Sequence, residues 1–533
     1  MEHLLVELND LPDEILLMIF KKLNNVSLLC SLISVNKRLN TIVRDSIFTR
    51  HLKLMRHSSN DSIGPLPDIT VDRLCSKILP EIRNQIQRLD LESSSVERIL
   101  LATNYPNLYG LGLFNLDTET ALSLFGDQSS LIHINKNQIS FLTIDTTELI
   151  NERSMEHPKT FVFTQIFIQY PNLQYLNFGS SSTLYRHLSF SNSPPICISS
   201  NLLELHISLS SFTDCLYMLD GRFNQLRIFH VNISSIHVGN KKVAKEEKLL
   251  NLKCFSLHCY EFTNVYNELI LPLVCRMSNL EKLDLNLLLH VKEKFIDGND
   301  LKKNLINHMT RLEKFTLNIY SILLSHNQID SQPLEYIQNT FNNFKYNQII
   351  CSVDYCETRC SQCRIYSYPY QLKFYNDITN NFSGELFTYV RKISLSDKSP
   401  FEHEFFLRIE KSFPFVEKIS MRNFQPQNNK LCTESNEDNQ HWSIVKYSHL
   451  TDLSLNTVHD DYVEQFLDNR KLRLPNNVHL DIGYEQIKRV TNNFTRNITQ
   501  INCRKLKSMC LYGVDEMSQH VTHYFPHTEI ICL

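Results

Sequence analysis

Apolar residues recur along the chain in a triplet of the form L-x-x-L-x-L, as in Leu280-x-x-Leu283-x-Leu285. The last two apolar positions are separated by one residue, which is the spacing of side chains on one face of a strand. Each copy therefore predicts a short strand, and copies about 28 residues apart predict a repeat architecture. The first nine copies begin at Ile86, Leu108, Ile139, Leu173, Leu202, Leu226, Leu252, Leu280 and Leu312.

Helix-like segments, such as residues 118–125, follow most of these strands. Strands that alternate with helices favour the α/β class with parallel strands. Because one strand and one helix cannot bury their apolar faces alone, neighbouring copies must stack into a solenoid. We expect a curved parallel sheet inside and helices outside, in a single body over residues 71–533 that follows a turn-rich linker at 53–70. The triplet is lost over residues 320–389, which predicts an irregular insertion.

A helical pattern replaces the triplet in the first 52 residues. Pro12 suits the first position of a helix, and apolar residues then recur at helical spacing from Ile15 to Leu23. Two further short helices are predicted, one near Leu28 and one from about Lys37. A three-helix module of this size cannot bury all of its apolar residues alone. Part of its surface must therefore contact the rest of the chain or a partner protein.

The same segment carries the run Leu11-Pro12-x-Glu14-Ile15-Leu16-x-x-Ile19-Phe20-x-x-Leu23, followed by Leu28 and Val35-x-Lys37-Arg38-Leu39. This run resembles an F-box, although Asn36 stands where cysteine or serine is common and Leu39 where tryptophan is common. The resemblance implies that residues 1–52 bind the small adaptor subunit of SCF-type cullin–RING ubiquitin ligases, and through it a cullin. The adaptor-binding residues that it implies are Leu11, Pro12, Ile15, Leu16, Ile19, Phe20, Leu23, Leu28, Val35 and Leu39.

The triplets resemble irregular leucine-rich repeats of the kind that is paired with F-boxes. Together the two resemblances imply a substrate receptor of a ubiquitin ligase that is not itself an enzyme. The alternative is a leucine-rich-repeat interaction scaffold without a ubiquitin-ligase role. An enzyme within residues 320–389 ranks last, because no catalytic motif supports it. Strand side chains alternate, so residues between the leucines face the concave surface, where a target protein is expected. The candidate target-binding residues are His206, His230, Ser256, Asp284 and Thr316.

Composition narrows the classes of function further. Glycine accounts for only 11 of 533 residues, and the glycine-rich nucleotide-binding and nucleophile motifs are missing from the sequence, so we expect no cofactor. The formal charge of −3, from 54 basic and 57 acidic residues, argues against nucleic acid. No apolar run is long enough to predict a membrane span. The 15 scattered cysteines and the lack of a secretory signal favour the cytoplasm and/or the nucleus.

Two groups of polar residues remain as candidate sites. Cys351, Cys356, Cys360 and Cys363 form C-x₄-C-x₃-C-x₂-C, and four thiolates can hold zinc in a tetrahedron. Structural zinc sites normally use two pairs separated by a longer loop, so free thiols are favoured here. Residues 459–461, His-Asp-Asp, are interpreted as the solvated face of a turn rather than an acid–base pair.

Overall fold

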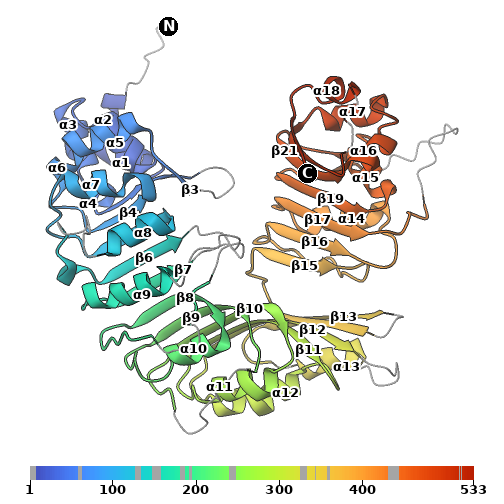
Figure 1. Cartoon of the computed structure of the whole chain (residues 1–533), viewed down its shortest axis with the longest axis horizontal. Helices are drawn as coiled ribbons and strands as arrows, with labels where there is room; N and C mark the ends of the chain where they lie inside the picture. The colour runs from blue at the N-terminus through green and yellow to red at the C-terminus, as the bar shows by residue number, and fades with distance from the viewer. Residues whose placement is uncertain are drawn as a thin grey trace. The chain divides into compact units, whose positions relative to one another are not determined.

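Figure 1 shows the computed structural model of the chain, which forms two compact units. Unit 1 comprises Met1–Val291 and Ile296–Ser321, and unit 2 comprises Lys292–Phe295 and Ile322–Leu533. Each unit is built on a mostly parallel sheet with helices packed against it. The structure describes residues 8–57, 63–126, 134–146, 158–179, 187–190, 195–238, 248–324, 333–342, 344–356, 360–429, 443–514, 517 and 519–533.

The N-terminal segment of unit 1 is helical, as its sequence pattern predicts. The asparagines that separate the helices also start them. Asn24 Oδ1 accepts a hydrogen bond from the backbone N–H of Val26 at 2.9 Å, and Asn36 Oδ1 accepts one from Leu39 at 2.8 Å. Both are N-caps, so Asn36 has a local structural role. The first described elements are a 3₁₀ turn at Leu8–Asp10, α1 (Asp13–Phe20), α2 (Asn25–Leu32), α3 (Lys37–Val43) and α4 (Ser46–Thr49).

These helices lead directly into the sheet of unit 1. Strand β1 (His51–Leu54) pairs with β4 (Arg88–Glu92), so the expected boundary between residues 52 and 53 falls inside a strand. The expected linker also contains β2 (Arg56–His57), β3 (Ile63–Gly64) and the start of α5 at Asp68. The sheet then continues in chain order through β5 (Gly110–Leu116), β6 (Phe141–Thr146), β7 (Tyr175–Gly179), β8 (Glu204–Ser211), β9 (Ile228–Ser235), β10 (Cys254–Thr263), β11 (Lys282–Val291) and β12 (Lys314–Leu324).

The triplet residues form the core of unit 1. Leu89, Leu111 and Leu142 are aligned across three neighbouring parallel strands and are fully buried. Burial of each such side chain contributes about 1.5–3 kcal/mol. The same register continues through Leu176, Leu205, Phe229, Phe255 and Leu283. The helices between the strands are α5 (Asp68–Arg73), α6 (Leu79–Ile82), α7 (Val96–Ala102), α8 (Thr118–Phe125), α9 (Pro158–Gln169), α10 (Phe212–Met218), α11 (Leu271–Cys275) and α12 (Gly298–Asn304).

Asparagine side chains join successive copies along the edge of unit 1 where the strands begin. Each of these asparagines stands directly before the first apolar residue of a triplet, and its Nδ2 donates to a backbone carbonyl of the preceding copy. The acceptor always lies two residues before the first apolar residue of that copy. The bonds run from Asn107 to Asn84 (2.7 Å), Asn172 to Asn137 (2.9 Å), Asn201 to Pro171 (2.9 Å), Asn251 to Asn224 (2.7 Å) and Asn279 to Leu250 (2.8 Å).

Unit 2 repeats the strand–helix pattern on a second parallel sheet. Its core is rich in aromatic rings, such as Tyr375, Phe387 and Phe413. The sheet contains β15 (Phe374–Ile378), β16 (Lys392–Ser396), β17 (Lys418–Asn423), β19 (Asp452–Val458), β21 (Val478–Gly483), β22 (Leu506–Tyr512) and β23 (Glu529–Cys532). The helices of this unit are α13 (Leu334–Thr340), α14 (His403–Ser412), α15 (Asp460–Leu467), α16 (Tyr484–Val490), α17 (Asn497–Cys503) and α18 (His520–Tyr524).

The structure confirms the mixed α/β class with large, mostly parallel sheets, but it differs from the expected single body over residues 71–533. The break falls within the expected insertion at 320–389, which contains the antiparallel hairpin of β13 (Gln348–Cys356) and β14 (Cys360–Tyr368). Consecutive parallel strands need a crossover connection, usually a helix, whereas a hairpin reverses the chain at once. The hairpin thus interrupts the parallel order, which resumes at β15.

Candidate functional sites

An exposed apolar patch lies on the N-terminal helices. On α1, Ile15, Met18 and Ile19 are spaced i, i+3, i+4 and share one face, with exposed fractions of 42%, 65% and 39%. Leu23 after α1 and Val35 before α3 are exposed to 50% and 59%. We call these five residues the apolar patch. So many bulky apolar side chains exposed in one small segment are typical of a surface that binds another protein.

The residues implied by the F-box resemblance divide into two groups in the structure. Ile15, Ile19, Leu23 and Val35 are exposed, together with Pro12, and Leu11 is partly exposed. Leu16, Phe20, Leu28 and Leu39 are at most 3% exposed and form the core of the helical segment. Met18 was missed, although its spacing from Ile15 was visible in the sequence. Helix α1 is apolar on both sides, so its sequence alone does not reveal which side faces inward.

The five candidate target-binding residues lie side by side on one face of the unit 1 sheet, as the strand alternation predicts. We call this face, opposite the buried leucines, the open face. The register aligns His206 with His230, His230 with Ser256, and Ser256 with Asp284. Thr316 Oγ1 donates to Asp284 Oδ1 at 2.7 Å. Whether they bind a target stays a prediction.

Two imidazole rings stack at one end of this row. The ring centroids of His206 and His230 are 4.4 Å apart, and the rings are inclined by only 13°. His206 Nε2 also contacts Glu204 Oε1 at 2.7 Å. Burial, together with the neighbouring His206, lowers the pKa of His230 from its usual 6.5 to about 4. His230 is therefore neutral at physiological pH.

Ser256, His258 and Asp284 bring a hydroxyl, an imidazole and a carboxylate together, but without the geometry of a catalytic triad. Ser256 Oγ lies 3.3 Å and Asp284 Oδ2 2.9 Å from the same ring nitrogen, His258 Nε2. A triad needs the carboxylate on Nδ1 and the hydroxyl on Nε2. Ser256 Oγ instead donates to Asp284 Oδ2 at 2.9 Å. Burial acts to raise the pKa of Asp284, but its bonds from His258, Thr316 and Ser256 lower it overall, which favours a structural carboxylate.

A row of stacked rings continues from the histidines across the open face. Tyr175 lies 5.3 Å from His206, and Phe141 stacks on Tyr175 with a centroid distance of 3.8 Å. The guanidinium of Arg88 lies 4.0 Å from the centre of the Phe141 ring, on the far side of β5. Gly110 makes this reach possible, because a Cβ there would lie 3.1 Å from Arg88 Cγ.

The cysteine cluster is spread along the β13–β14 hairpin. Cys351 and Cys363 are buried, and burial raises the pKa of Cys351 to about 12 and that of Cys363 further, which favours thiols over thiolates. The register pairs Cys356 with Cys360, whose side chains lie outside the described residues. The buried pair favours the free-thiol alternative, and the described part of the chain contains no group of metal-ligating side chains.

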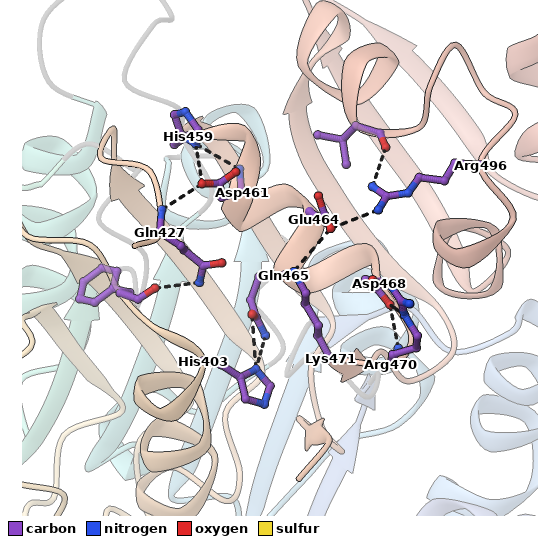
Figure 2. Close-up of polar contacts among 12 residues, drawn as sticks. His403, Gln427, His459, Asp461, Glu464, Gln465, Asp468, Arg470, Lys471 and Arg496 are labelled. Atoms are coloured by element: carbon purple, nitrogen blue, oxygen red, sulfur yellow. Dashed lines mark hydrogen bonds and ion pairs between the residues drawn. The ribbon is translucent and has the colours of Figure 1, made fainter. Parts of the chain in front are cut away.

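Buried polar residues surround α15 in unit 2 (Figure 2). Asp461 is 7% exposed and accepts a hydrogen bond from the backbone N–H of Gln427 at 2.9 Å, so the interpretation of residues 459–461 as a solvated turn is wrong for Asp461. Gln465 Nε2 lies 3.0 Å from Nδ1 of His403. The ring's Nε2 contacts the backbone carbonyl of Ser443 at 3.0 Å. These contacts tie loops to the helix, which is a structural role.

A shallow depression of about 540 Å³ lies at the end of β19 and β21, where α15 and α16 begin. Phe424 and Tyr512 are exposed beside it. Its Asp460 and Arg489 form a bidentate ion pair at 2.8 and 2.9 Å. This pair lowers the pKa of Asp460 and leaves little unpaired charge for a ligand.

Comparison with known proteins defines one part of the chain. Residues 8–54 match the F-box-like family, so the chain carries an F-box-like domain that contains the apolar patch. A search of curated proteins finds no match. Among solved structures, the complex of Rad7 and Elc1 in yeast is similar over 97% of this chain and 92% of that chain, at 12% identity and a TM-score of 0.23. No helix among the described residues is long and apolar enough to cross a membrane.

Proposed function

We propose that this chain is the substrate-recognition subunit of an SCF-type cullin–RING ubiquitin ligase. The F-box-like domain binds the small adaptor subunit, which connects it to a cullin. The two strand–helix units, which we interpret as divergent leucine-rich repeats, bind the target protein. The observation that carries this proposal is the apolar patch, because it lies within the segment that matches the F-box-like family.

The chain's contribution is to bring two proteins together, and it supplies no catalytic residue. A target held beside a ubiquitin-loaded enzyme experiences a high effective concentration of the reactive group. The geometry of Ser256, His258 and Asp284 is consistent with this role, because it lacks the order of a hydrolytic triad. The complex is expected to act in the cytoplasm and/or the nucleus.

The adaptor should bury Ile15 and Ile19, so polar substitutions there should weaken binding without unfolding the domain. In isothermal titration of the full chain with a recombinant SCF adaptor subunit, Ile15→Ser with Ile19→Ser should reduce affinity at least tenfold, since hot-spot truncations cost about 1–3 kcal/mol each. Leu16 and Phe20 are unsuitable for this test, because they are buried and their truncation would create cavities.

Ile69 and Leu101 provide a matched control, since they are exposed to 84% and 53% outside the patch. Ile69→Ser with Leu101→Ser should leave adaptor affinity unchanged. Wild-type affinity in the patch variant would exclude the proposed docking surface. A wild-type chain that binds no adaptor or cullin would favour the alternative, an interaction scaffold without a ubiquitin-ligase role.

A further inference from the structure

The edge of unit 2 where the strands begin carries exposed rings at the position that asparagine occupies in unit 1. Tyr389, Phe415 and His449 each stand directly before the first apolar residue of a triplet. We call these three residues the aromatic row. Tyr389 is 54% and Phe415 is 40% exposed, and the rings of Phe415 and His449 are 5.4 Å apart. Neighbouring parallel strands lie about 4.8 Å apart, so the row extends over about 10 Å.

At this edge, a residue other than the one before the triplet donates to the backbone carbonyl of the preceding copy. If this edge followed the unit 1 pattern, an asparagine at position 415 would donate to the backbone carbonyl of residue 388. Here Arg391 Nη1 donates to the Thr388 carbonyl at 2.8 Å. The Arg391 guanidinium also lies 5.2 Å from the centre of the Phe415 ring. The Thr388 carbonyl thus has a donor without an asparagine at position 415, and the Phe415 ring contacts the preceding copy through Arg391 while it stays 40% exposed.

Cations gather where the first strands of this edge begin. Arg391 and Lys392 stand at the start of β16, and Lys418 starts β17. Two acidic residues accompany them: Glu417 lies 3.5 Å from Arg391, and Asp452 lies 3.0 Å from Lys418. These three cations and two carboxylates leave a local charge of +1, although the whole chain has a formal charge of −3.

We propose that the aromatic row and these cations bind an extended acidic segment of the target protein, with a bulky apolar side chain packed against Tyr389 and Phe415. The apolar side chain would pack on the exposed rings, and the flanking carboxylates would pair with Lys392 and its neighbours. An extended chain advances about 3.3 Å per residue, so three or four residues span the row. This inference rests on the proposed receptor function, since it assigns the partner to the target.

The test measures binding of defined peptides to the purified full chain by fluorescence anisotropy. Three labelled 12-residue peptides share one central Phe-Leu pair, flanked by Glu and Asp, by Lys, or by Ser. The acidic peptide should bind at least tenfold more tightly than the other two, and added salt should weaken it. Equal binding of all three peptides, or preference for the Lys peptide, would overturn the proposal.

Tyr389→Asn with Phe415→Asn restores the unit 1 residue at both positions. This variant should lose at least tenfold in affinity for the acidic peptide while its melting temperature stays at the wild-type value. Tyr109→Asn with Phe161→Asn is the matched control, because these unit 1 rings are exposed to 45% and 43%, and it should bind the peptide normally. Unchanged affinity in the edge variant would show that the rings do not bind the peptide, and a drop of several degrees in its melting temperature would show that they are structural.

The outcome is separable from that of the proposed function. Ile15→Ser with Ile19→Ser should leave peptide affinity intact, and the edge variant should bind the adaptor normally. A chain that binds the acidic peptide but no adaptor would contradict the ligase role alone. A chain that binds the adaptor but shows no preference for the acidic peptide would contradict the aromatic row alone.

Discussion

The two units use the same position of their triplet for different purposes. In unit 1, the residue before the triplet is an asparagine in five copies, and its side chain holds the preceding copy by a hydrogen bond of 2.7–2.9 Å. In three copies of unit 2, the residue is Tyr389, Phe415 or His449, all exposed, and before the copy that begins at Leu506 it is Lys505. An asparagine held by such a bond offers a partner only a small polar surface, whereas an exposed ring offers a large apolar one. The comparison indicates that unit 1 uses this edge for cohesion, whereas the edge of unit 2 is available for recognition.

Unit 2 compensates with longer cationic side chains. Arg391 donates to the Thr388 carbonyl within its own copy, and Lys505 Nζ donates to the Leu474 carbonyl at 2.7 Å. Both bonds satisfy backbone acceptors in place of an asparagine. Arg391 reaches the Thr388 carbonyl from within its own copy, so position 415 is free to vary, whereas Lys505 itself stands directly before its triplet. Four predictions test this contrast, from the largest expected effect to the smallest.

The two units should respond separately to loss of their cores. Leu283 in β11 and Leu453 in β19 are each 1% exposed, so Leu283→Asp and Leu453→Asp each bury an uncompensated carboxylate. Each should cost about 4 kcal/mol or more in the unit that carries it. Hydrogen exchange should show loss of protection in unit 1 for the first variant and in unit 2 for the second. Loss across the whole chain in both variants would show one cooperative body.

The asparagine bonds should contribute measurable stability. Asn279→Ala removes the donor to the Leu250 carbonyl and should lower the free energy of unfolding by about 1 kcal/mol, the usual net value of such a bond. His449→Ala, at the same position in unit 2, should change it by less than about 0.5 kcal/mol, as exposed substitutions usually do. Urea unfolding of both variants compares the two edges. Equal losses of unfolding free energy in the two variants would contradict the proposed difference between the edges of unit 1 and unit 2.

The histidine stack distinguishes the open face of unit 1 from that of unit 2, where Ser394, Ser420 and Ser454 occupy the equivalent row. The pKa of His230 is lowered to about 4, so the folded state binds fewer protons than the unfolded state between pH 6.5 and 4. Its contribution to stability is complete above pH 6.5 and is lost as the pH falls through this window. Because Glu204 and Asp284 also face His230 and the ring is partly solvated, the loss should be somewhat under 1 kcal/mol.

The measurement is the thermal unfolding of wild type and His230→Asn at pH 7 and pH 5. The wild type should lose more stability than the variant on acidification, and the difference between the two losses isolates the imidazole. The other titrating groups are common to both proteins and cancel in this difference. An equal loss in both would show that His230 titrates normally in the folded state.

Much of the fold could be predicted from the sequence, because the triplet places a strand wherever it occurs. Leu111 and Leu283 are buried and aligned as their spacing indicates. The break between the units could not be predicted. The β13–β14 hairpin lies where the triplet is lost, so no hydrophobic repeat indicates how the strands pair there. The helical start of the chain was also predicted, with Pro12 at the beginning of its first helix.

The candidate sites depended on contacts that no local pattern encodes. The pattern of α1 predicted one apolar stripe, but neighbours far along the chain decide that Leu16 faces inward and Ile15 outward. Asp461 was interpreted as solvated because a local pattern cannot show its partner. That partner, the backbone N–H of Gln427, is 34 residues away in sequence. The aromatic row was not predicted, because the sequence does not show that asparagines at this position bond the preceding copy in unit 1. Nor does it show that Arg391 is the donor to the Thr388 carbonyl in unit 2.

The smallest expected effect on the free energy of unfolding concerns the donor to the Thr388 carbonyl at the unit 2 edge. Arg391→Ala leaves the Thr388 carbonyl without its donor, at a cost of about 0.5 kcal/mol because Thr388 is exposed and water can replace the arginine. Phe415→Asn places an amide where unit 1 has one, so the double variant should recover most of this loss. A double-mutant cycle by urea unfolding measures this as a favourable coupling between the two substitutions. Strict additivity would mean that an asparagine at 415 does not reach the carbonyl, and that the two edges differ in backbone geometry as well as in side chains.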